Sequence, residues 1–297
     1  MRVFITGAAG FVGSAVVADL IAHGHEAVGL ARSDANVEKL TSLGAGVHRG
    51  DLSDIASLRS GAEKADAVIH CGFIHDFAKI AENSAIDRAA IAAMGEVLKG
   101  SARPMLATSG VGLLAPGRVA TEDDPHPPIN PQWPRASEAA VNELAQAGVN
   151  ASSVRLAPSV HDAGDHGFVP MIIGIARAKG VSAYVEEGVN RWPGVHRLDA
   201  GSLYRLAILK GAKGANWHGV GEEGVATRQI AEVIGKRLGV PVKSIPRAEA
   251  MAHFGFLGGF FQGDIPASSA RTQAALGWKP THKGLLADID SEAYFPG

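Results

Sequence analysis

The amino-acid sequence predicts an α/β protein, with a doubly wound parallel sheet followed by a smaller, mostly helical lobe. Short apolar runs alternate with amphipathic segments as far as about residue 157. Strands that alternate with helices in this way form parallel sheets with right-handed crossovers. Several of the runs are apolar throughout, which indicates strands covered by helices on both faces. A glycine-rich loop between the first apolar run and the first amphipathic segment is typical of the same architecture.

Six apolar runs predict buried strands, at residues 3–6, 27–31, 47–49, 67–71, 105–108 and 153–157. Helices are predicted between them, at residues 11–23, 35–43, 55–63, 84–99 and 135–147. After residue 157 glycine and proline interrupt the pattern, and helices are predicted again at residues 169–179, 200–210, 227–238 and 269–276. The stretch 115–134 is rich in proline and acidic residues and is too long for an ordinary connection, so we expect it at a binding site or its rim.

Composition excludes several classes of protein. A hydrophobic content of 46% with 20% charged residues indicates a folded globular chain. The net charge of −2 gives no electrostatic reason to expect nucleic acid or an anionic membrane as a partner. Cys71 is the single cysteine, which excludes an internal disulfide and suits a reducing compartment. No apolar run approaches the length of a membrane span, so we expect a cytoplasmic protein.

The glycine-rich loop has the spacing G-x-x-G-x-x-G, formed by Gly7, Gly10 and Gly13. The first glycine allows a tight turn out of the strand, and the second lets backbone N–H groups approach phosphate oxygens. The third allows the helix to pack close to the sheet. A pyrophosphate is then held at the helix N-terminus, where free N–H groups and the helix dipole favour negative charge. The loop predicts a dinucleotide cofactor; the alternative is a glycine turn with a purely structural role.

The end of the second strand favours NADP over NAD. NAD-binding proteins place an acidic residue there to hold the ribose hydroxyls, whereas this chain has Arg32 and Ser33. A guanidinium binds a 2′-phosphate through paired, charge-assisted hydrogen bonds, and the serine adds a hydroxyl donor. Asp34 comes slightly late for the ribose and is equally suited to cap the next helix. The alternative for Arg32 is a solvated loop cation.

Seven stretches in order resemble the extended and atypical short-chain dehydrogenases/reductases, a group that includes NAD(P)-dependent epimerases and dehydratases. The stretches are residues 6–13, 50–52, 68–72, 108–110, 155–161, 195–200 and 276–280. The resemblance implies a cofactor-binding domain over residues 1–160, with a return segment near 195–220. Residues 161–297 are then mainly the substrate-binding lobe.

The resemblance and the loop together imply a set of cofactor contacts. They are Gly7, Ala9, Gly10, Phe11, Val12, Gly13, Arg32, Ser33, Asp51, Leu52, Cys71, Gly72, Phe73, Thr108, Ala157, Pro158, Ser159 and Val160. Cys71 is expected to pack against the cofactor as a small apolar side chain. No metal site is expected.

The catalytic pair of the family is missing. Its Tyr and Lys lie four residues apart on the helix after the fifth strand, where this chain has Arg135 and Ala139. The three tyrosines, Tyr184, Tyr204 and Tyr294, all lie outside that helix. The usual proton chemistry of the family is therefore not expected here.

Four other residues are candidates for catalysis. Ser109, at the carboxyl end of the fifth strand, is expected to face the ligand crevice and to orient the substrate. The alternative is a serine that only forms a hydrogen bond with the loop. Arg135 stabilises a developing oxyanion but cannot donate a proton. His75 and His161 follow the fourth and sixth strands and are suited to general acid catalysis, although a histidine is more often a packing or surface residue. His196 is assigned to the structural return segment.

The expected function is that of an NADP-dependent oxidoreductase acting on a small carbonyl-containing or otherwise reducible substrate. One alternative is a sensor that binds NADP without turnover, and another is a nucleotide-sugar epimerase or dehydratase. The apolar stretch 254–261 suits a substrate pocket, a dimer contact or the core of the lobe. The alanine-rich helices at 84–99 and 135–147 resemble the family's dimer contact, so a homodimer is possible.

Overall fold

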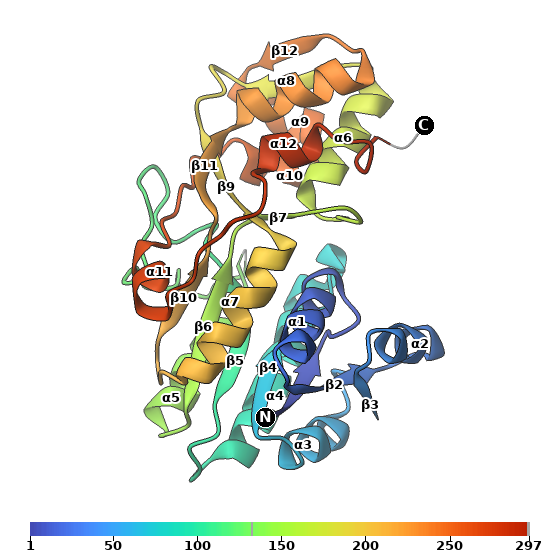
Figure 1. The fold of residues 1–297 in the computed structure, drawn as a ribbon. Coiled ribbons are helices and arrows are strands. Elements are labelled where there is room, and N and C mark those ends of the chain that lie inside the picture. Colours follow the sequence, from blue (N-terminus) through green and yellow to red (C-terminus); the bar gives the residue numbers. More distant parts are fainter. Residues whose placement is uncertain (132, 296–297) are drawn as a thin grey trace.

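A seven-stranded parallel sheet forms the larger part of the molecule (Figure 1). The computed structural model describes residues 1–131 and 133–295. The strand order is β10-β6-β5-β4-β1-β2-β3, which confirms the predicted fold class. The strands are β1 (Arg2–Thr6), β2 (Glu26–Ala31), β3 (Gly46–Arg49), β4 (Ala67–His70), β5 (Met105–Gly110), β6 (Ala151–Leu156) and β10 (Asn216–Gly219).

Helices cover both faces of this sheet, as the apolar strands predict. One face is covered by α1 (Phe11–Ala22), α2 (Asp34–Ser42) and α7 (Arg197–Lys210). The other face is covered by α3 (Ile55–Glu63), α4 (Ile80–Leu98) and α5 (Ser137–Gln146). The alternation of strand side chains decides the division: Val3 and Ile5 of β1 pack on the α1 side and Phe4 on the α4 side.

The sheet reverses its strand order between β1 and β4, which leaves a crevice at the carboxyl ends of these strands. Hydrogen bonds connect the carboxyl ends of β1 and β4. The Cys71 amide donates to the Thr6 carbonyl (3.1 Å), and the Gly72 amide donates to Thr6 Oγ1 (3.2 Å). Gly7 turns away here with φ +67°, and a Cβ on it would lie 2.7 Å from the Gly72 nitrogen. The first glycine of the loop is therefore required by both its backbone angle and its neighbour.

The smaller lobe lies beyond this edge of the sheet (Figure 1). Its strands are β7 (Ser159–His161), β9 (Arg191–His196) and β11 (Glu222–Ala226) in one sheet, and β8 (Ser182–Val185) and β12 (Val242–Ile245) in another. Its helices are α6 (Phe168–Lys179), α8 (Thr227–Leu238), α9 (Ala250–Phe254), α10 (Leu257–Phe261) and α12 (Leu285–Ile289). The short α11 (Ala270–Leu276) returns to pack near α7. The lobe has its own apolar core, which includes the buried Trp192 and Phe261.

The predicted helices match the structure closely, but β10 and the five strands of the lobe were not predicted. The helices predicted at 55–63 and 227–238 have the bounds of α3 and α8. Ser33 is the N-cap of α2, because its Oγ accepts the Asn36 amide (3.3 Å), so the expectation that Asp34 caps this helix is wrong. Asp34 lies in the first helical turn and pairs with Arg49. Among the described residues, no helix has the length and apolarity needed to cross a bilayer.

A buried ion pair between β6 and α5 holds the edge of the sheet. Arg155 is fully buried, and its guanidinium donates to both carboxylate oxygens of Glu138, which is also buried. Arg155 also donates to the Asp124 carbonyl (2.8 Å) and to His218 Nε2 (3.2 Å). Part of the acidic, proline-rich stretch 115–134 therefore caps a buried cation.

Removing one partner of this pair is expected to destabilise the fold strongly. Glu138→Ala leaves the Arg155 charge buried and unpaired, which should lower the free energy of unfolding by about 3–5 kcal/mol. Urea unfolding followed by circular dichroism measures the change. The control is Glu232→Ala, which breaks the exposed Arg228–Glu232 pair on α8 and should cost about 0.5 kcal/mol or less. Equal effects of the two substitutions would contradict the assignment.

Candidate functional site

The N-terminus of α1 is open toward the crevice. Its N-cap is Gly10, which has no side chain to cap the helix, and the first turn contains no acidic residue. The loop is tight: the Gly10 amide donates to the Gly7 carbonyl (2.8 Å), and a Cβ on Gly13 would lie 2.1 Å from that oxygen. Backbone N–H groups at a helix N-terminus with no competing carboxylate suit a pyrophosphate. These residues therefore fit the dinucleotide that the sequence predicts.

A second observation in the predicted cofactor segment agrees with this fit. Ala157 and Pro158 connect β6 to β7, and Ser159 and Val160 begin β7. The Ser159 hydroxyl is buried, and within the described residues it has no hydrogen-bond partner. A buried hydroxyl without a partner is costly unless a ligand or water completes it.

The ends of β2 and β3 place an exposed cation where the adenosine ribose is expected. The Arg32 side chain is 73% exposed, and its Nε lies 3.8 Å from Asp51 Oδ2. Hydrogen bonds from Ser53 and the nearby Arg32 charge lower the pKa of Asp51, so this carboxylate is ionised. Ser33 Oγ accepts the helix cap bond but keeps its own proton to donate.

Tyr204, which was not predicted as a site residue, is hydrogen-bonded to the end of β5. Thr108 Oγ1 donates to the His70 carbonyl (2.8 Å) and lies 2.7 Å from the Tyr204 hydroxyl. Because the threonine has a single proton, Tyr204 must be the donor to it. Burial raises the pKa of Tyr204 well above its ordinary value, so the phenol stays protonated. Tyr204 thus fastens α7 to the carboxyl ends of β4 and β5.

Arg135 lies two residues before α5 and is anchored at the carboxyl end of β5. Its Nε donates to Ser137 Oγ (3.0 Å) and its Nη2 to the Thr108 carbonyl (3.1 Å). Its Cζ lies 4.4 Å from the centre of the Phe73 ring, within the range of a cation–π interaction. Two hydrogen bonds use two of its five N–H donors, so an anchored guanidinium still offers hydrogen bonds to a ligand.

A buried chain of hydrogen bonds connects this guanidinium to the glycine loop. Thr6 Oγ1 and His70 Nδ1 are 2.7 Å apart, and His70 Nε2 is 3.0 Å from Asp87 Oδ1. Ser137 donates to the other oxygen of Asp87 (2.6 Å) and accepts from Arg135. Burial raises the pKa of Asp87, but the bonds from His70 and Ser137 and the Arg135 charge outweigh it, and the pKa lies below its usual range. Sequence reasoning missed this chain.

The two candidate histidines lie in different environments. His75 is exposed at one edge and packs between the rings of Phe73 (5.2 Å) and Phe77 (6.3 Å), near Arg135. Partial burial and the Arg135 charge lower its pKa. His161 is only 1% exposed, and its Nδ1 is 2.9 Å from Asp288 Oδ2. His161 is therefore held in the lobe by Asp288, and its role as a proton donor stays a prediction.

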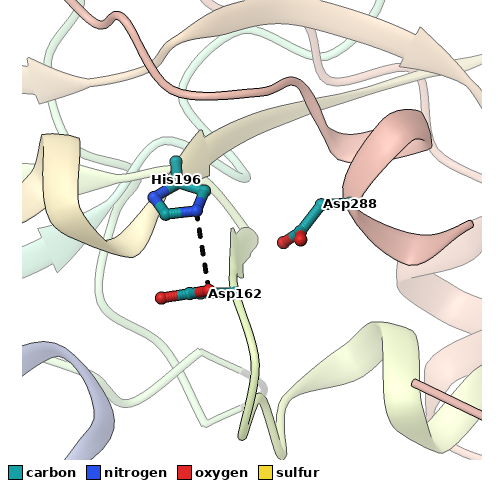
Figure 2. Close-up of side chains that lie close together, drawn as sticks. All are labelled: Asp162, His196 and Asp288. Carbon is teal, nitrogen blue, oxygen red and sulfur yellow. Dashed lines mark ion pairs between the residues drawn. The ribbon is translucent and has the colours of Figure 1, made fainter. Parts of the chain in front are cut away.

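His161 contacts a cluster of three residues, which Figure 2 shows: Asp162, His196 and Asp288. Ligand atoms of these three residues lie within 4.8 Å of one another, a spacing that a metal ion could bridge. Protein cations already neutralise both carboxylates: Arg197 pairs with Asp162 (3.0 Å) and Lys283 with Asp288 (2.8 Å).

The protonation of His196 argues further against a metal in this cluster. Its Nδ1 accepts the Leu198 amide (3.3 Å) at the start of α7, so the proton of the neutral ring is on Nε2. Nε2 is the atom that faces Asp162, at 3.6 Å. A metal on Nε2 would require the proton on Nδ1, where it would face the Leu198 N–H, so the cluster is instead explained as an ion-pair network that caps α7.

The fold and the open glycine loop define an α/β protein of the dinucleotide-binding class. A family model described as the NAD dependent epimerase/dehydratase family matches residues 3–218, and the chain belongs to this family. It is 48% identical over 298 residues to an uncharacterized protein of Schizosaccharomyces pombe, covering 99% of this chain and 100% of that one. An uncharacterized protein of Saccharomyces cerevisiae is also 48% identical, over 97% of this chain and 98% of its own.

Two further comparisons concern proteins with stated activities. The chain is 27% identical to a decarboxylating sterol-4-alpha-carboxylate 3-dehydrogenase of Dictyostelium discoideum, over 82% of this chain and 78% of that one. The solved structure of a dTDP-glucose 4,6-dehydratase from Streptomyces venezuelae, with NAD and TYD bound, superposes with a TM-score of 0.77. It covers 98% of this chain and 95% of the other at 18% identity, and so it supports the fold alone.

The ion-pair network around His196 predicts how stability depends on pH. Burial and the neighbouring His161 and His282 lower the pKa of His196 below its ordinary 6.5, despite the opposing charge of Asp162. The unfolded chain then binds a proton more readily than the folded one, so the free energy of unfolding should fall as pH falls through about 6.5.

His196→Asn tests this, because the amide oxygen can still accept the Leu198 amide but cannot titrate. Urea unfolding at several pH values between about 7 and 5 should give a shallower decline for the variant. The decline should not vanish, since the pKa of His218 is also lowered by burial. An unchanged slope would show that His196 does not contribute.

Proposed function

We propose that this protein is an NADP(H)-dependent oxidoreductase that reduces a carbonyl group. The observation on which the proposal rests is Arg135, a guanidinium held at the carboxyl end of β5 by the Thr108 carbonyl and the Phe73 ring. The family and the similarity to a dehydrogenase support the reaction class. Arg32 supports the choice of NADP.

The bound nicotinamide would supply a hydride to the carbonyl carbon of the substrate. The carbonyl electron pair then moves to the oxygen, where negative charge develops. Arg135 is suited to hold this oxygen, because its anchors fix the guanidinium before the charge appears and an anchored donor needs no reorganisation. The Ser109 hydroxyl, next along β5, would orient the substrate by a further hydrogen bond.

The oxygen must then take a proton to give the alcohol, and Arg135 cannot supply it. His75 is the candidate donor, since its ring contacts the same Phe73 that Arg135 covers. Because burial and the Arg135 charge lower the pKa of His75, its donating form becomes more populated as pH falls. The reaction therefore consumes one carbonyl compound, one NADPH and one proton, and produces an alcohol and NADP⁺.

Cofactor binding without turnover is the second candidate function. The observation that favours it is Arg135 at the position of the family tyrosine, with Ala139 at that of the lysine. A homodimer through α4 and α5, and a cytoplasmic location, stay predictions.

Cofactor choice is tested at Arg32. Arg32→Ala removes the paired, charge-assisted hydrogen bonds to the 2′-phosphate, so the Kd for NADP should rise about 10- to 100-fold. The Kd for NAD, which has no such phosphate, should stay within about twofold. Isothermal titration measures both constants, and Arg59→Ala on the exposed side of α3 is the control. A tenfold preference of the unmodified protein for NAD would contradict the NADP proposal.

Turnover is tested at Arg135. NADPH oxidation is followed by nicotinamide absorbance with a panel of aldehydes, ketones and quinones. Arg135→Met keeps the length of the side chain but removes its charge and donors, so kcat should fall about 100-fold or more, the usual cost of losing an oxyanion donor. The Kd for NADP should be unchanged. A folded, cofactor-loaded protein that reduces nothing in the panel would favour cofactor binding without turnover.

A further inference from the structure

Aromatic rings border the candidate catalytic groups and bridge the sheet domain and the lobe. The aromatic cluster is formed by Phe73, Phe77, Trp133, Phe256 and Phe260. Phe77 and Phe256 have ring centres 4.9 Å apart, and those of Trp133 and Phe260 are 5.2 Å apart. In each pair one ring comes from the sheet domain and the other from the segment of α10.

The cluster continues directly into the proposed active site. Arg135 lies over Phe73, and His75 contacts both Phe73 and Phe77. Trp133 is two residues before Arg135 in the chain. On the other side, Phe256 and Phe260 are four residues apart around the start of α10, a spacing that puts both on one side of a helical turn.

Three rings of this cluster are partly exposed to solvent. Phe77, Trp133 and Phe256 are 40%, 40% and 42% exposed, although large aromatic side chains are usually buried. The other three tryptophans of the chain are buried. Exposed aromatic surface next to reactive polar groups is typical of a ligand site rather than of a domain contact.

The charges around the cluster do not suit a nucleoside diphosphate. The stretch 254–261, which supplies Phe256 and Phe260, contains no lysine or arginine. Most arginines of the lobe are paired with acidic side chains, including Arg191 with Asp264 and Arg247 with Glu186. Among the described arginines after residue 160, Arg177 alone has no such partner, and it lines a separate hollow of 260 Å³.

We infer that the substrate is a planar, aromatic carbonyl compound without phosphate, bound against the Phe77–Phe256 and Trp133–Phe260 rings with its oxygen toward Arg135. The term substrate rests on the proposed oxidoreductase function, whereas the binding of this compound does not depend on that function. Flat rings stack on or edge against aromatic side chains, and their apolar surface is removed from water. A diphosphate would bring two or more negative charges to a surface where Arg135 is the cation in contact with the cluster.

Trp133 is the exposed tryptophan of this chain and provides a binding signal that does not need turnover. Titration of the NADP-loaded protein with 2-naphthaldehyde should quench its fluorescence to saturation, and Trp133→Phe should abolish the saturable part. Phe256→Ala should raise the Kd about tenfold. Leu209→Ala removes an equally exposed apolar side chain at the far end of α7 and should leave the Kd unchanged.

UDP-glucose, added as the competitor, should neither quench Trp133 nor displace the aldehyde. Quenching that does not saturate, displacement by UDP-glucose, or a Kd unaffected by both Phe256→Ala and Phe77→Ala would overturn the inference. Saturable, Phe256-dependent binding without NADPH oxidation would support the aromatic site while rejecting the oxidoreductase function. The two proposals can therefore fail separately.

Discussion

The rest of the site depends on the junction between β1 and β4, where one threonine satisfies two neighbours. Thr6 Oγ1 accepts the Gly72 amide and bonds to His70, so the glycine loop and the end of β4 are set by the same atom. From His70 the contacts run through Asp87 and Ser137 to Arg135. The position of the phosphate-binding loop and that of the anchored guanidinium are thus not independent.

Buried charged side chains are paired with opposite charges at two junctions of this structure. Arg155 and Glu138 neutralise each other between β6 and α5, and Lys283 neutralises Asp288 where β7 meets α12. Burying an ion is costly, so an isolated partner would favour another arrangement of the chain. These pairs therefore fix how the sheet edge and the lobe pack, while the apolar cores supply most of the stabilising free energy.

Sequence reasoning succeeded where one local pattern decides the structure. Six of the seven strands of the main sheet are predicted from short, largely apolar runs, and the glycine spacing indicates the loop without tertiary information. The seventh, β10, was missed because its sequence Asn-Trp-His-Gly has no apolar run. Sequence reasoning missed the strands of the lobe, because they are only three to six residues long and Pro193 and Gly194 interrupt β9. It also missed Tyr204 and Asp87, because their partners are 96 and 50 residues away and no spacing in the chain relates them.

The solitary cysteine gives the chain an internal reporter of its own folding. Burial at the end of β4 raises the pKa of Cys71 to about 12. Since the thiolate is the reactive species, alkylating reagents at neutral pH should leave the native thiol almost untouched, whereas in an open chain its pKa returns to about 8.5. The rate of alkylation then measures how often the carboxyl end of β4 becomes exposed, with no label or added tag.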